Sequence, residues 1–66
     1  MKHYAIESIG TGTNTRYCVK QVFRGGTNPA IYKTFKTVKQ ALEAAFIAGI
    51  EVEAVGDYYD ILGIAN

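Results

Sequence analysis

Basic side chains at even spacing are the feature of this 66-residue sequence that most directly suggests chemistry. Three of them lie four residues apart in a run rich in aromatic and β-branched residues, which is typical of a strand, so they share one face. Basic groups beside aromatic rings on a sheet can contact phosphates and stack on bases. An ordinary solvated sheet face explains the same spacing. The candidates for contacts with a partner protein or a nucleic acid are Arg16, Lys20, Arg24, Tyr32, Lys33 and Lys36.

The charges are divided along the chain. All seven lysines and arginines lie in residues 1–39, where Glu7 is the only acidic residue. The other acidic residues lie in residues 40–66, so the net charge of +1 conceals a basic half and an acidic half. Such a division suits a charged partner, or the head-to-tail pairing of two subunits.

No set of residues has the types and spacing of a catalytic or metal-binding site. The single cysteine, Cys18, lies within a strand and is expected to be a buried structural thiol, and one Cys with His3 cannot supply the four ligands of a zinc site. Glu51 and Glu53 share one side of a strand, which we interpret as a solvated acidic edge. Gly10–Gly12 predicts a hairpin loop, because a strand follows it. We therefore expect no enzymatic activity, no metal and no cofactor.

Length and composition predict one soluble domain. A chain of 66 residues forms a single domain, and a hydrophobic content of 48% argues against disorder. No run approaches the roughly 20 apolar residues of a membrane span, so we expect no membrane contact. A free thiol without an export signal predicts a cytoplasmic protein.

Hydrophobic periodicity predicts an α+β fold, in which a small antiparallel sheet of three to five strands packs on one helix. The expected order is β-β-β-α-β, with a final strand left open. Gly25 to Pro29 is expected to be a turn. The predicted elements are strands at 2–9, 16–24 and 30–36, a helix at 38–48, and strands at 51–55 and 58–64.

The helix is the best-defined element. Thr37 is the expected N-cap, Gln40 completes a capping box three residues later, and Gly49 is the expected residue after the C-cap. Apolar residues at helical spacing predict the face that packs on the sheet: Val38, Ala41, Leu42, Ala45 and Phe46.

The second half of the helix carries no charge on any side between Ala44 and Ile50. A surface helix normally keeps a polar face, so either the C-terminal tail or a second subunit is expected to cover it. The sequence favours a homodimer, because so short a chain has little structure with which to cover two faces. The interface candidates are Phe46, Ile47 and Ile50.

Residues 2–48 resemble the AP2-like, arm-type N-terminal DNA-binding domains of phage integrases. The resemblance lies in three short strands followed by Thr34-Phe35-Lys36-Thr37 and then Ala41 at the entry to the helix. It implies that the outer sheet face enters the major groove of DNA, with contacts from Arg16, Lys20, Arg24 and Lys33. The acidic tail from Glu51 onward lies outside the resemblance.

Two functions follow from these observations. The first is a small non-enzymatic regulator, adaptor or inhibitor that binds a protein, forms a homodimer, and comes from a phage or another mobile element. It rests on the lack of catalytic residues, the two-sided apolar helix and the divided charge. The alternative is a nucleic-acid-binding domain that uses the basic sheet face.

Overall fold

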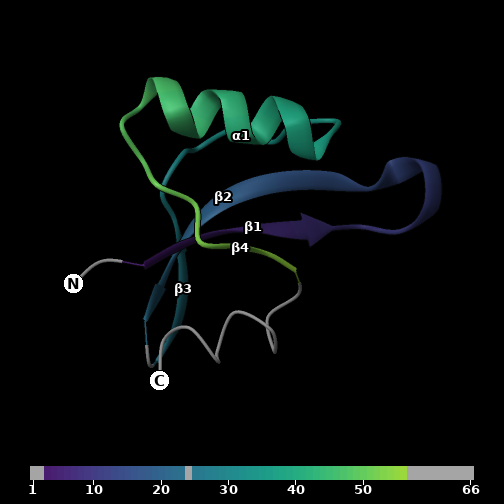
Figure 1. Cartoon of the computed structure of the whole chain (residues 1–66). Coiled ribbons are helices and arrows are strands. Elements are labelled where there is room, and N and C mark those ends of the chain that lie inside the picture. Colours follow the sequence, from purple (N-terminus) through teal and green to yellow (C-terminus); the bar gives the residue numbers. More distant parts are fainter. Residues whose placement is uncertain (1–2, 24, 57–66) are drawn as a thin grey trace.

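The computed structural model describes residues 3–23 and 25–56, which form one four-stranded sheet with a single helix on one face (Figure 1). The strands lie in the order β3-β2-β1-β4. The α+β class and the order β-β-β-α-β are therefore confirmed. The elements are β1 (His3–Ile9), a 3-10 turn η1 (Gly12–Asn14), β2 (Arg16–Phe23), β3 (Gly26–Pro29), α1 (Val38–Ile47) and β4 (Ala54–Val55).

The sheet is mixed, whereas the sequence predicted antiparallel pairing. β1 and β2 form an antiparallel hairpin from His3 opposite Val22 to Ile9 opposite Arg16. After β3 the chain crosses the sheet through α1, and β4 then runs parallel to β1. A helical crossover is the usual way to bring a strand back in the parallel direction. The expected strand at 51–55 is reduced to Ala54–Val55.

The third strand lies earlier than predicted. Gly26–Pro29, which the sequence predicted as a turn, pairs with β2. Most of the predicted strand at 30–36 instead leaves the ladder as a long bulge. The amides of Ala30 and Ile31 both donate to the carbonyl of Val19, and pairing resumes only between Tyr17 and Phe35. Five residues, 30–34, thus lie opposite two residues of β2. Pro29 is compatible with β3 because β3 is an edge strand, where a missing amide costs no ladder bond.

The start of α1 is fixed as the sequence predicted. The Thr37 hydroxyl accepts a hydrogen bond from the amide of Gln40 at 3.1 Å. The Gln40 side-chain oxygen accepts from the amide of Lys36, also at 3.1 Å. This differs from an ordinary capping box by one residue. It satisfies one backbone donor that the helix leaves free, and the amide of the residue before the N-cap.

The end of α1 is fixed by Gly49, which has a φ of 74°. The amide of Gly49 donates to the carbonyl of Phe46, and the amide of Ile50 donates to that of Ala45. These two bonds form a Schellman motif, which requires a left-handed residue and so favours glycine at this position. The predicted C-terminal signal is confirmed.

Small residues bring α1 onto the sheet. Ala41 and Ala45 are fully buried against Ile6 and Val19, the largest fully buried side chains of the described chain. Val38 also packs against this cluster. The prediction that Leu42 and Phe46 belong to the core stripe is wrong. Both are exposed, because the helix has turned its alanines, and not its larger apolar residues, toward the strands.

The opposite sheet face also holds buried side chains. Ala5, Cys18 and Val22 are buried on this face, with Ala54 of β4 packed beside Ala5 and Val22. It is therefore not the solvated outer face that the alternation of Arg16 and Lys20 suggested. The expected strand at 58–64 and Arg24 lie outside the described residues. No helix within residues 3–23 and 25–56 is long and apolar enough to cross a membrane.

The alanine contact predicts unequal costs for two neighbouring substitutions. Ala45→Leu must force a larger side chain between α1 and the sheet, and we expect a loss of about 1–3 kcal/mol in the free energy of unfolding. Phe46→Ala removes an exposed ring and should change it by no more than about 0.5 kcal/mol. Urea denaturation in dilute solution measures both. Equal losses for the two variants would contradict this orientation of the helix.

Candidate protein-binding surface

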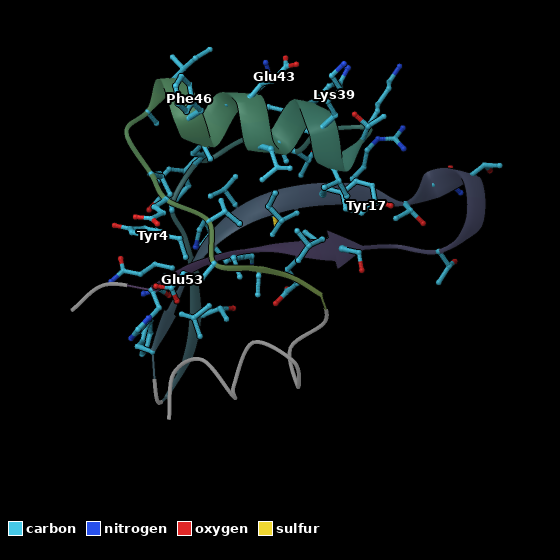
Figure 2. The ribbon with its side chains drawn as sticks, in the orientation of Figure 1. Tyr4, Tyr17, Lys39, Glu43, Phe46 and Glu53 are labelled. Carbon is cyan, nitrogen blue, oxygen red and sulfur yellow. The ribbon has the colours of Figure 1, made fainter. Side chains whose placement is uncertain are left out.

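The outer face of α1 carries the largest exposed apolar side chains of the helix. Phe46 and Ile47 are each 85% exposed, and Leu42 is 41% exposed. Figure 2 shows Lys39, Glu43 and Phe46 on the side of the helix that faces away from the sheet. Exposure of two large apolar residues side by side on a rigid element is uncommon unless they have a partner.

Two shallow depressions extend this face toward the bulge that follows β3. One is lined by Lys39, Leu42, Glu43, Phe46 and Ile47. The other lies between the bulge and α1, and it shares Glu43 and Ile47 with the first. The two are therefore one continuous surface, which we call the helix-face surface. Its further members are Lys33, Thr34, Phe35, Lys36, Gln40 and Ala44.

The charges of the helix-face surface change along the helix axis. Lys36 and Lys39 flank the helix N-terminus, the first turn of α1 contains no acidic residue, and Glu43 follows one turn later. The N-terminal end of a helix carries a partial positive charge, so basic side chains there are in the less favourable position. Lys33 lies near this end, with its Nζ 5.7 Å from the centre of the Phe35 ring.

The predicted contact residues of β2 do not form an open basic face. The Lys20 Nζ lies 3.8 Å from the Glu7 carboxylate, and both side chains are mostly buried. Glu7 Oε2 is buried without a hydrogen-bond partner among the described residues, which increases the dependence of this carboxylate on Lys20. The Arg16 guanidinium donates to the carbonyl of Thr15 at 2.9 Å. Lys20 and Arg16 are thus engaged within the fold.

The predicted contact residues after β3 are exposed. Tyr32 is 91% exposed, and Lys33 and Lys36 are also open to solvent. Lys33 and Lys36 belong to the helix-face surface, and Tyr32 lies beside Lys33 at the edge of a neighbouring depression. The structure therefore separates the six candidates into a half-buried pair on β2 that contacts other groups of the fold, an exposed group at 32–36, and Arg24, which is not described.

The predicted interface residues also divide. Phe46 and Ile47 share the helix-face surface, but Ile50 follows the Schellman turn and packs against the core cluster of Ile6 and Val19. Sequence reasoning missed Leu42, Lys39 and Glu43 as members of this surface. Their spacing was a usable signal, because Lys39, Glu43 and Phe46 fall on one side of a helix at i, i+4 and i+7, and charged residues mark that side as exposed.

Cys18 and His3, which could form a thiol–imidazole pair, lie far apart. Cys18 is buried, its thiol donates to the carbonyl of Glu7, and burial raises its pKa. The His3 ring donates to the Glu53 carboxylate at 2.8 Å. His3 lies four residues along β1 from the position opposite Cys18, a separation of roughly 13 Å. Among the described residues, no three Asp, Glu, His or Cys side chains come together to hold a metal.

Burial of Cys18 predicts a loss of stability at high pH. Well below the ordinary thiol pKa of 9.0, Cys18 is protonated in both the folded and the unfolded chain. Above that value the unfolded chain releases the proton first, so the free energy of unfolding falls as pH rises through the raised pKa. Urea denaturation of the wild type and Cys18→Ala between about pH 8 and pH 11 measures the difference. A difference that does not change with pH would show that the folded thiol titrates normally.

Comparison with known proteins gives no relative from which a function could be transferred. No protein family, characterised protein or solved structure matches this chain. The resemblance to the arm-type domains of phage integrases therefore stays a prediction. The proposals below rest on the geometry of the helix-face surface and on the burial of its surroundings.

Proposed function

We propose that this chain is a small non-enzymatic regulator, adaptor or inhibitor that acts in the cytoplasm by binding a protein through the helix-face surface. The observation that carries the proposal is the 85% exposure of both Phe46 and Ile47 on a helix whose two ends are fixed by hydrogen bonds. An origin in a phage or another mobile element belongs to this proposal as a prediction.

The helix-face surface has the composition of an interface. Aromatic and aliphatic anchors near the centre of a contact, with polar residues around them, provide most of the binding free energy in protein complexes. Phe46 and Ile47 are such anchors, and Lys39 and Glu43 flank them. Full burial of each anchor contributes about 1.5–3 kcal/mol, which is less than the usual cost of association. A stable complex must therefore also use the depression beside the bulge.

The rigidity of α1 favours binding. The N-cap hydrogen bond of Thr37 and the Schellman bonds of Gly49 and Ile50 hold the helix ends, while Ala41 and Ala45 fix its rotation on the sheet. A partner that binds this surface consequently meets side chains on a preformed helix. Preorganisation lowers the conformational entropy lost on association and so raises affinity.

Site-specific photo-cross-linking tests the proposal. A benzoylphenylalanine at position 46, in the cell from which the protein comes, should form an adduct with another polypeptide, whether a second copy or a different protein. The same photoreactive residue at Phe23, a half-exposed ring of β2 outside the helix-face surface, is the matched control. Equal or absent adducts at the two positions would overturn the proposal.

Nucleic-acid binding is the second candidate, and the exposed group at 32–36 is the observation that favours it. Tyr32 could stack on a base, and Lys33 and Lys36 lie close enough in sequence to contact neighbouring phosphates. Nucleic-acid binding through the sheet face is less well supported, because Lys20 is paired with Glu7 and Arg16 donates to backbone carbonyls.

Fluorescence anisotropy with mixed-sequence DNA and RNA separates the two candidates. If the protein-binding proposal is correct, we expect no binding that weakens between about 50 and 200 mM salt. Salt-sensitive binding that is lost in the double variant Lys33→Ala/Lys36→Ala would instead assign a nucleic-acid function to the segment at 32–36. Lys20→Ala is the control: it should lower stability, because Glu7 loses its cation, and leave any affinity unchanged.

A further inference from the structure

The charged and aromatic residues on the side of α1 that faces away from the sheet follow an unusual order along the helix. Lys39, Glu43 and Phe46 follow one another at spacings of four and three residues, so they form one row along α1. Lys36 precedes the N-cap and lines the adjoining depression beside the bulge. Lys39 and Glu43 are equally distant in sequence from position 41, and so are Lys36 and Phe46. The chemistry is not symmetric: two cations occupy the N-terminal half, and an anion and an aromatic ring occupy the C-terminal half.

This row is complementary to a reversed copy of itself. Consider a second helix that lies antiparallel on the side of α1 that faces away from the sheet, with the two helices meeting at the level of position 41. Lys39 of each copy then meets Glu43 of the other. In the same register, Lys36 of each copy meets Phe46 of the other. The first contact pairs opposite charges, and the second places an ammonium group over an aromatic ring. A two-fold axis forms each contact twice.

The shape and the electrostatics of the surface fit the same register. Phe46 of the second copy would enter the depression between the bulge and α1, which Lys33, Phe35 and Lys36 line. The basic N-terminal end of each helix would also lie beside the C-terminal end of the other, where the helix dipole is negative and the exposed Glu51 follows. The unfavourable placement of Lys36 and Lys39 in one chain becomes favourable in the pair.

We infer that the occupant of the helix-face surface is a second copy of this chain, bound with the two α1 helices antiparallel and with reciprocal Lys39–Glu43 and Lys36–Phe46 contacts. The inference rests on the proposed protein-binding function of this surface. A ten-residue helix offers less area than the roughly 800 Å² that each partner contributes to a standard interface, so the dimer is a weak one in reversible exchange.

A charge-swap experiment by sedimentation equilibrium at low salt tests the inference. The wild type should dimerise, and K39E and E43K should each weaken dimerisation about tenfold, because each places like charges opposite one another. The double variant K39E/E43K should restore the wild-type association. An equimolar mixture of K39E and E43K should form a heterodimer in preference to either homodimer, because only the mixed pair has two opposite-charge contacts.

Other results would overturn either self-association or the antiparallel register. A wild type that stays monomeric throughout the concentration range would overturn self-association; a cross-linked adduct with a different protein at position 46 would then still support the proposed function. A dimer that is insensitive to both single swaps, or a mixture without heterodimer preference, would overturn the antiparallel register. Helical circular dichroism of every variant confirms that the fold survives, as the exposure of Lys39 and Glu43 predicts.

Discussion

The contact of Ala41 and Ala45 with Ile6 and Val19 is the interaction on which the rest of the structure depends. Two alanines one helical turn apart allow the helix axis to approach the strands closely, and this approach fixes the rotation of α1 about its own axis. Once that rotation is set, Phe46 and Ile47 cannot also face the sheet, because they lie on the other side of the same helix. The exposure of the anchors is therefore a consequence of the core and not a local accident.

The sheet restricts where a free basic surface can form. Both of its faces hold fully buried side chains, Ile6 and Val19 on the helix side and Ala5 and Val22 on the other. Lys20 lies on this second face, opposite the buried Ala5, and is held by Glu7 in an environment where an unpaired carboxylate would be costly. Among the described residues, the exposed basic side chains follow β3, where the bulge carries the chain out of the ladder and toward the helix N-terminus.

Elements determined by local chemistry could be predicted from the sequence, and those determined by long-range fit could not. Thr37 and Gly49 define the ends of α1 through bonds to residues only a few positions away, and alternation in β1 and β2 follows from their burial in a hairpin. The position of β3 depends instead on which backbone groups complete the ladder of β2. Gly26 to Pro29 pair there despite a composition that is typical of turns, because tertiary pairing overrides local preference.

The residues of the candidate surface also depend on long-range fit, because the packing of α1 on the sheet decides which of its sides is exposed. Apolar spacing places Ala41, Ala45, Leu42 and Phe46 on one broad face of α1, and hydrophobicity alone favours the larger residues for the core. The space between α1 and the sheet accommodates the smaller alanines, so Ala41 and Ala45 are the residues that are buried. As a result, α1 departs from two general preferences of proteins. Aromatic rings are usually buried, but Phe46 is exposed, and basic residues usually avoid the positive N-terminal end of a helix, but Lys36 and Lys39 lie beside it. Natural sequences are locally consistent elsewhere, so two departures that lie close together, and that one reversed copy would relieve together, are the physical reason for proposing a binding surface here.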